Sequence, residues 1–174
     1  MPNNSVLPRI RAFLDKIAKV ESSGANPSDF SVEHPVIQTG LQRGQQAIGA
    51  YGLLPNTIDE MIERMRRERS ASPELRGLEG LDKDELQKTF DNRPDLYQKI
   101  TDRLAQHVFR DTKDPEVAAY RWNTGHNLPL ESITPDKLDS NPYVQKFKHI
   151  NDTITRKPAA IADSLAEEDE DQEE

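Results

Sequence analysis

The sequence predicts an all-helical fold. Apolar residues recur at spacings of three and four in several segments, most clearly in Pro8–Val20 and in residues 93–110. Prolines, glycines and short polar residues separate these segments and indicate turns. The chain has no cysteine, so neither a disulfide framework nor a thiolate metal site is expected.

Length and charge indicate one domain followed by an acidic tail. A chain of 174 residues suits a single domain with its own core. Eight acids and no base lie between Asp163 and Glu174, and the net charge of the whole chain is −8, so residues 1–162 are formally neutral. We therefore expect a domain over residues 1–157 and a disordered acidic tail over residues 158–174. A neutral body with an acidic tail gives no basis for direct nucleic-acid binding.

The first helix is expected from Pro8 to Glu21, because proline suits a first helical position and the polar turn from Ser22 to Pro27 follows Glu21. One stripe of this helix is apolar and holds Ile10, Phe13, Leu14, Ile17 and Ala18. Residues 22–50 are predicted to be irregular, with room for a small hairpin. A loop this long inside a domain is usually functional.

The later elements are predicted from proline or aspartate starts and helical spacing. A helix follows Pro55, with Asn56 or Thr57 as its cap, and residues 70–80 are expected to form a turn region. Further helices are predicted over residues 81–90 and 93–110, from Asp114 to Gly125, and after residues 135 and 142.

Glu21 is the strongest candidate for a catalytic group. It extends the apolar stripe of the first helix, three residues after Ala18 and four after Ile17, and it falls in the last helical turn. Burial and the negative end of the helix dipole both disfavour the charged carboxylate, so both raise its pKa. A carboxylic acid that stays protonated near neutral pH is suited to general acid catalysis.

Three motifs occur in an order that resembles the lytic transglycosylase and lysozyme-like family, which cleaves peptidoglycan. Glu21-Ser22 ends the first helix, and residues 47–57 form a glycine-hinged loop that opens into a helix. Residues 118–125 form an aromatic helix end that resembles a stretched form of the family's third motif. The resemblance covers roughly residues 8–125. It departs from the family in the loop, where a sugar-contacting glutamine is usual and this chain has Gly52 to Pro55.

The resemblance implies that Glu21 is the catalytic acid and that peptidoglycan glycan strands are the substrate. Glu21 would protonate the glycosidic oxygen, the substrate's acetamido group would stabilise the cation, and Glu21 would then deprotonate the C6 hydroxyl to give a 1,6-anhydro product. The substrate-binding residues that it implies are Ser22, Gly49, Tyr51, Gly52, Leu53, Tyr120 and Asn123.

Several alternatives stay open at this point. Glu21 is either catalytic or a buried acid that accepts N–H bonds from the Ser22–Gly24 turn. Tyr120 either contacts Glu21 or the cleft, or packs in the core, and Tyr51 either stacks on sugar or packs the loop. A hydrolase needs a second acid to hold water, for which Asp29 and Glu33 are candidates.

The functional alternatives are a catalytically impaired, lysozyme-like structural or ejection protein of a phage virion and a helical adaptor. The four histidines show no ligand spacing, so neither a metal nor another cofactor is expected. The N-terminus lacks a signal-peptide pattern, and no segment has the length of a membrane span. We expect synthesis in the cytoplasm and action at the cell wall, with carriage in a virion and contact with other virion proteins as one route.

Overall fold

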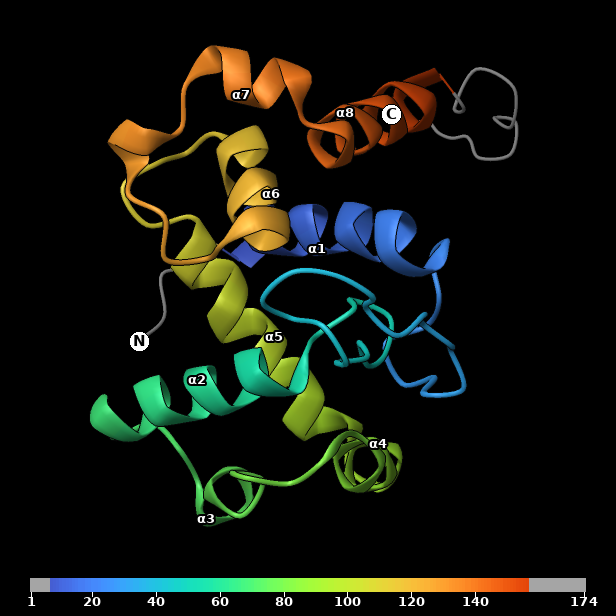
Figure 1. Ribbon diagram of the computed structural model, residues 1–174, viewed down its shortest axis with the longest axis vertical. Coiled ribbons are helices and arrows are strands. Elements are labelled where there is room, and N and C mark those ends of the chain that lie inside the picture. Colours follow the sequence, from blue (N-terminus) through green and yellow to red (C-terminus); the bar gives the residue numbers. More distant parts are fainter. Residues whose placement is uncertain (1–6, 157–174) are drawn as a thin grey trace.

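The structure, a computed structural model, describes the backbone of residues 7–156 and the side chains of residues 8–150. This part of the chain forms eight α-helices and a short 3-10 helix, with no named strand, which confirms the all-helical fold class (Figure 1). The helices are α1 (Leu7–Ser22), α2 (Pro55–Arg67), α3 (Pro73–Arg76), α4 (Lys83–Asn92), α5 (Pro94–Val108), α6 (Pro115–Thr124), η1 (Leu130–Ser132), α7 (Pro135–Ser140) and α8 (Pro142–Arg156). The predicted tail, residues 158–174, lies outside the described residues.

Proline begins six of the helices in the described part of the chain: α2, α3, α5, α6, α7 and α8. Its fixed φ suits the first turn, where a backbone N–H would have no helical partner. The predicted cap of α2 is wrong, because Pro55 takes the first position and Leu54 is the cap residue, without a side-chain bond. The turn region predicted over residues 70–80 contains α3, which Ser72 caps through the Leu75 N–H.

Helix α5 runs through the middle of the molecule, and α1, α2, α4 and α6 all pack against it (Figure 1). Helix α8 packs on α1 and α6. One aromatic cluster surrounds Phe13 of α1, whose ring contacts Phe109, Trp122 and Phe147. A second cluster joins Phe30, Phe90 and Tyr97 near the other end of α5. The helices therefore form two groups, α1 with α6 to α8 and α2 with α4, that meet along α5.

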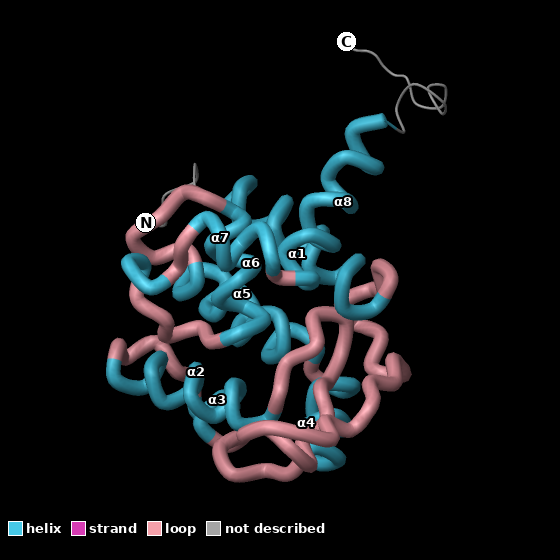
Figure 2. The backbone as a smooth tube through the Cα atoms, turned by 45° about the horizontal axis from the view of Figure 1, so that its top comes forward, coloured by secondary structure: helices cyan, strands magenta, loops and turns pink. Residues whose placement is uncertain are grey.

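The segment between α1 and α2 is a long loop that folds back on itself (Figure 2). Two isolated antiparallel bridges, Val36 with Gln46 and Ile48 with Leu53, hold it together. The small hairpin expected here is therefore reduced to single bridges. The second bridge closes a four-residue turn, Gly49–Gly52, which lies against the C-terminal end of α1.

Candidate active site

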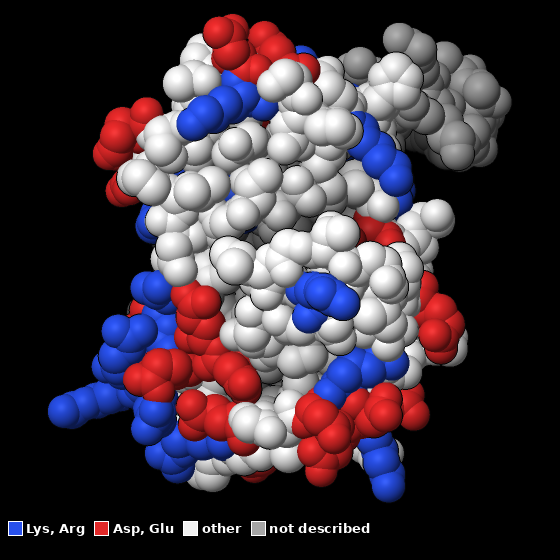
Figure 3. Space-filling model, viewed as in Figure 1, with Lys and Arg blue, Asp and Glu red and all other residues white. Residues whose placement is uncertain are grey.

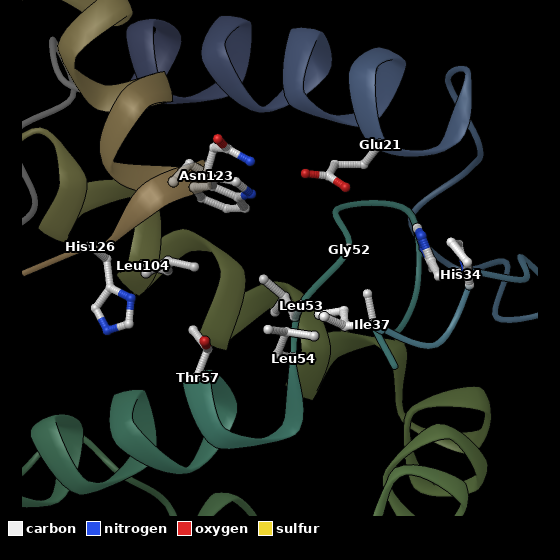
Figure 4. Close-up of a pocket in the computed structure, with 13 residues that line it drawn as sticks. Glu21, His34, Ile37, Gly52, Leu53, Leu54, Thr57, Leu104, Asn123 and His126 are labelled. Atoms are coloured by element: carbon white, nitrogen blue, oxygen red, sulfur yellow. The ribbon is translucent and has the colours of Figure 1, made fainter. Parts of the chain in front are cut away.

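A groove of about 280 Å³ opens beside the C-terminal end of α1. It lies between the two groups of helices, and side chains from α1, the long loop, α2, α5 and α6 line it (Figure 4). Its lining residues are Glu21, His34, Pro35, Ile37, Ala47, Gly52, Leu53, Leu54, Thr57, Leu104, Trp122, Asn123 and His126. An adjoining compartment of about 370 Å³ shares five of them, from Leu54 to His126, so the groove continues along α2 to Glu60.

The groove contains little formal charge. Its first compartment is lined by one acid, Glu21, and by two histidines, and the second compartment adds one acid, Glu60. Neither compartment is lined by a lysine or an arginine. The space-filling view likewise shows few charged side chains across the middle of this face, whereas acids and bases gather at its lower end (Figure 3). An uncharged polymer with apolar ring faces suits such a surface better than a polyanion does.

Glu21 projects into this groove because α1 ends abruptly just after it (Figure 4). Ser23 and Gly24 adopt left-handed conformations, with φ of 60° and 88°, and the Gly24 N–H returns to the Ala18 carbonyl at 3.1 Å. The N–H groups of this turn thus bond to α1 itself and to Ser22 Oγ. The interpretation of Glu21 as their acceptor is not supported, and the carboxyl group is left facing the groove.

Burial raises the pKa of Glu21 above its ordinary value. A hydrogen bond from Tyr143 and the nearby positive charges of His34 and Lys146 act in the opposite direction, but burial has the larger effect. The Tyr143 hydroxyl donates to Glu21 Oε2 at 2.7 Å. The protonated form of Glu21 is therefore favoured. Once Glu21 has given up its proton, the Tyr143 hydroxyl stabilises the carboxylate.

Gly52 lies directly against this carboxyl group. Its φ of 66° is in the left-handed region, and a Cβ built on it would lie 2.5 Å from Glu21 Oε1. The positive φ favours glycine at this position, and any larger residue would displace the Glu21 carboxyl group. The missing side chain leaves room for Oε1 at the edge of the groove.

Tyr143 was missed by the sequence analysis, which expected a tyrosine contact to Glu21 only from Tyr120. Tyr143 lies in the first turn of α8, beside Val144 and four residues before Phe147, so the local pattern indicates only a core-facing stripe. Tyr120 is half-buried on α6 and does not line the groove. The contact with Glu21, which the sequence left open as one alternative for Tyr120, is made by Tyr143.

Replacing Tyr143 by phenylalanine is expected to lower kcat about tenfold, because the Glu21 carboxylate loses a hydrogen bond to a charged group. The pKa of Glu21 should rise further, since Tyr143 lowers it. The basic limb of the pH–kcat/KM profile should therefore move to higher pH. Tyr120→Phe is the matched comparison: a larger loss in that variant than in Tyr143→Phe would reverse the assignment.

Three other residues predicted to bind substrate lie behind the groove lining and do not face the groove. Ser22 Oγ lies 2.9 Å from the Ala50 carbonyl and accepts the Ala25 N–H, so it ties α1 to the turn and does not line the groove. Gly49 is buried against Tyr97, whose hydroxyl would be 2.6 Å from an added Cβ. Tyr51 is 2% exposed, stacks on Tyr97 and lines neither compartment, so the structure places it in the core rather than on a sugar.

Two further predicted residues do reach the groove. Leu53 lines the first compartment, although it is only 2% exposed. Asn123 is exposed at the end of α6 and lines both compartments, so its amide is available to a bound molecule (Figure 4). Trp122 beside it packs edge-on against Phe13 and also lines both compartments.

The two acids considered for a hydrolase lie outside the groove. Asp29 is exposed and accepts hydrogen bonds from the N–H and hydroxyl of Ser31, which lower its pKa. Glu33 is exposed and lines a different surface hollow beside α4. Neither is placed to hold a water molecule in the groove opposite Glu21.

The far wall of the groove is the loop after α6. Asn127 Nδ2 donates to Glu60 Oε2 at 2.6 Å, and His126 Nε2 lies 3.0 Å from the same oxygen. Two arginines hold this loop by its backbone: Arg110 donates to the carbonyls of His126 and Leu128, and the fully buried Arg121 also donates to the Leu128 carbonyl. The wall is therefore fixed to α2, to α6 and to the turn that follows α5.

Comparison of the chain with family models, with curated protein sequences and with solved structures gave no match. The functional assignment therefore depends on the geometry of the groove. Within residues 8–150 no cluster of three potential ligands among histidine, aspartate and glutamate is arranged to hold a metal ion. None of the described helices combines the length and apolar character needed to cross a membrane.

Proposed function

We propose that the protein is a lytic transglycosylase with a lysozyme-like fold. It would cleave the β-1,4 bond between N-acetylmuramic acid and N-acetylglucosamine in peptidoglycan. The main observation behind the proposal is a half-buried carboxyl group with a raised pKa, Glu21, at the side of an open groove that has little charge. The sequence resemblance and the order of its motifs point to the same activity.

The proposed reaction uses Glu21 twice. Because Oε2 accepts the Tyr143 hydrogen bond, Oε1 holds the proton that passes to the glycosidic oxygen as the bond from that oxygen to C1 breaks. The substrate's acetamido oxygen stabilises the cation at C1, and the Glu21 carboxylate then takes the proton of the C6 hydroxyl, whose oxygen closes the ring on C1. Tyr143 stabilises the carboxylate between the two steps. The placement of Asp29 and Glu33 outside the groove favours this route over hydrolysis with a second acid.

The same proposal includes the place of action. Peptidoglycan strands are the expected partner, and the protein would act at the cell wall, carried there in a virion or released at lysis. Other virion proteins are candidate partners on the first route. The neutral groove fits a glycan strand, which alternates polar edges with apolar ring faces.

One observation favours a second candidate, a non-catalytic structural or ejection protein with the same scaffold. Gly52, Leu53 and Leu54 present no amide where the family's loop usually has a glutamine. Asn123 supplies an amide from α6, across the groove. The two candidate functions differ in whether the Asn123 amide binds the sugar that the family's loop glutamine usually contacts.

The deciding experiment is digestion of purified peptidoglycan followed by mass spectrometry of the soluble fragments. We expect clearing of the suspension and muropeptides that end in a 1,6-anhydro ring, which are one water molecule lighter than reducing-end products. Reducing ends would instead indicate hydrolysis. Absence of fragments, together with retention of the protein on sedimented peptidoglycan, would support the non-catalytic candidate.

A further inference from the structure

The Gly49–Gly52 turn is buried, although it is a loop. Gly49, Ala50 and Tyr51 are all buried, so the backbone polar groups of the turn have little access to water. Buried backbone N–H and C=O groups need partners, and a turn of four residues makes few bonds within itself. The turn supplies one internal bond, from the Gly52 N–H to the Gly49 carbonyl at 3.2 Å.

Two side chains from distant parts of the sequence supply the other partners, together with Ser22. The Tyr97 hydroxyl on α5 donates to the Ile48 carbonyl at 2.7 Å and accepts the Tyr51 N–H at 3.1 Å. His34 Nε2 lies 2.8 Å from the Gly49 carbonyl. A carbonyl only accepts, so Nε2 carries the proton and donates.

Both side chains are firmly held. Tyr97 is fully buried, and its ring contacts the rings of Phe30, Tyr51 and Phe90. His34 is 9% exposed, and its own carbonyl accepts the Gln46 side-chain amide at 2.6 Å. Hydrogen bonds from Tyr97 on α5 and from His34 on the long loop thus hold the turn in place.

What the turn presents to the groove is Gly52, whose missing Cβ would lie 2.5 Å from Glu21 Oε1. We infer that Tyr97 and His34 are positioning residues of this site, which hold the Gly49–Gly52 turn against the Glu21 carboxyl group and keep water from that side of it. The inference concerns the site assigned above and rests on the proposed function for its catalytic meaning. The contact itself does not depend on which reaction Glu21 performs.

Loss of the Tyr97 hydroxyl removes the partner of the Tyr51 N–H and leaves the Ile48 carbonyl bonded to the Leu53 N–H alone. We expect water to enter and satisfy the freed N–H. The same water hydrates Glu21, which removes part of the burial that raises its pKa. Tyr143, His34 and Lys146 also face Glu21, but Tyr97→Phe leaves all three in place. Loosening the turn therefore lowers the pKa of Glu21, whereas loss of the Tyr143 hydroxyl raises it. The two variants are distinguished by the direction of the change.

The test is an NMR titration of the full chain with ¹³C-labelled glutamate, in which the Glu21 signal is identified by its absence from Glu21→Gln. In Tyr97→Phe we expect the Glu21 midpoint to fall by about half a pH unit or more. We also expect kcat on peptidoglycan to fall about tenfold with little change in KM. Thr101→Val is the matched control, because it removes another fully buried hydroxyl of α5, bonded only to the Tyr97 carbonyl. It should lower stability but leave the Glu21 midpoint unchanged.

A second pair of variants tests His34 without relying on Tyr97. His34→Gln keeps an N–H donor for the Gly49 carbonyl, whereas His34→Leu does not, and both remove the imidazole ring. We expect the Glu21 midpoint to be lower in the leucine variant than in the glutamine variant. Equal midpoints in this pair, or a wild-type midpoint in folded Tyr97→Phe, would overturn the inference. These titrations need no activity, so an inactive wild-type protein with the expected shifts would reject the proposed function and keep the positioning role.

Discussion

Peptidoglycan clearing is expected to fall at least about 1,000-fold in Glu21→Gln, since general acid catalysis is worth 10²–10⁴ and this group also serves as the base. Glutamine keeps the size of the side chain and still accepts the Tyr143 hydrogen bond, so the groove should keep its shape. The measurement is the initial rate of turbidity loss, with circular dichroism as the check on folding. Clearing at the wild-type rate would remove Glu21 from the mechanism.

The same variant should be more stable than the wild-type protein at neutral pH. Burial raises the folded-state pKa of Glu21 above its value in the unfolded chain, so its contribution to stability is full only at low pH. That contribution is lost as the pH rises through the folded-state pKa. Glutamine does not ionise, so the advantage of the variant should be small near pH 4 and grow toward neutral pH. We expect the melting temperature of Glu21→Gln to exceed that of the wild-type protein by an amount that grows between pH 4 and pH 7.

A stability deficit of Glu21→Gln that grows as the pH rises from 4 toward neutral would contradict this account of the site. It would mean that the carboxylate is stabilised by its surroundings. The raised pKa, and with it the role of general acid, would then have no basis. Thermal denaturation at several pH values between 4 and 8 separates the two cases.

Adding one methyl group at Gly52 is expected to reduce activity about 100-fold. The new Cβ would lie 2.5 Å from Glu21 Oε1, so either the carboxyl group or the turn must move. The change also costs about 1 kcal/mol because φ is positive, and this cost must be separated from the clash. Gly40→Ala is the matched control, because its φ is 84° and no atom lies within 4 Å of the added Cβ.

We therefore expect Gly40→Ala to show the conformational cost alone, as a lower melting temperature with unchanged clearing. Gly52→Ala should lose both stability and activity. If the two variants cleared peptidoglycan equally well, the contact between Gly52 and Glu21 would have no functional role. A crystal structure of Gly52→Ala would show whether the carboxyl group or the turn is displaced.

The sequence predicted the helices well because their signals are local. A proline at the first position and an apolar stripe need only neighbouring residues, and they placed α1, α2 and α5 to within a few residues. The expected burial of Glu21 followed from the same stripe, and the structure makes this residue half-buried. Desolvation raises its pKa, as the stripe indicated.

What the sequence could not provide were contacts between residues far apart in the chain. Tyr143 is 122 positions from Glu21, and Tyr97 is 46 positions from the Tyr51 N–H that it accepts. Neither residue has a local pattern that differs from ordinary core packing. His34 gave no signal either, because a single histidine in a loop has no spacing to interpret. For Tyr51 the sequence left two alternatives, stacking on a sugar or packing of the loop, and the structure packs its side chain inward onto Tyr97.

The loop after α6 is anchored through two main-chain carbonyls, held by Arg110 and by the buried Arg121, and through the side chains of His126 and Asn127. A hydrogen bond to a main-chain carbonyl does not depend on which side chain its residue carries. An exchange at position 128 would therefore keep the carbonyl and its two arginine donors, whereas an exchange at 126 would lose the side-chain contact with Glu60. The side chain at position 128 can therefore vary without loss of the hydrogen bonds that anchor this wall of the groove.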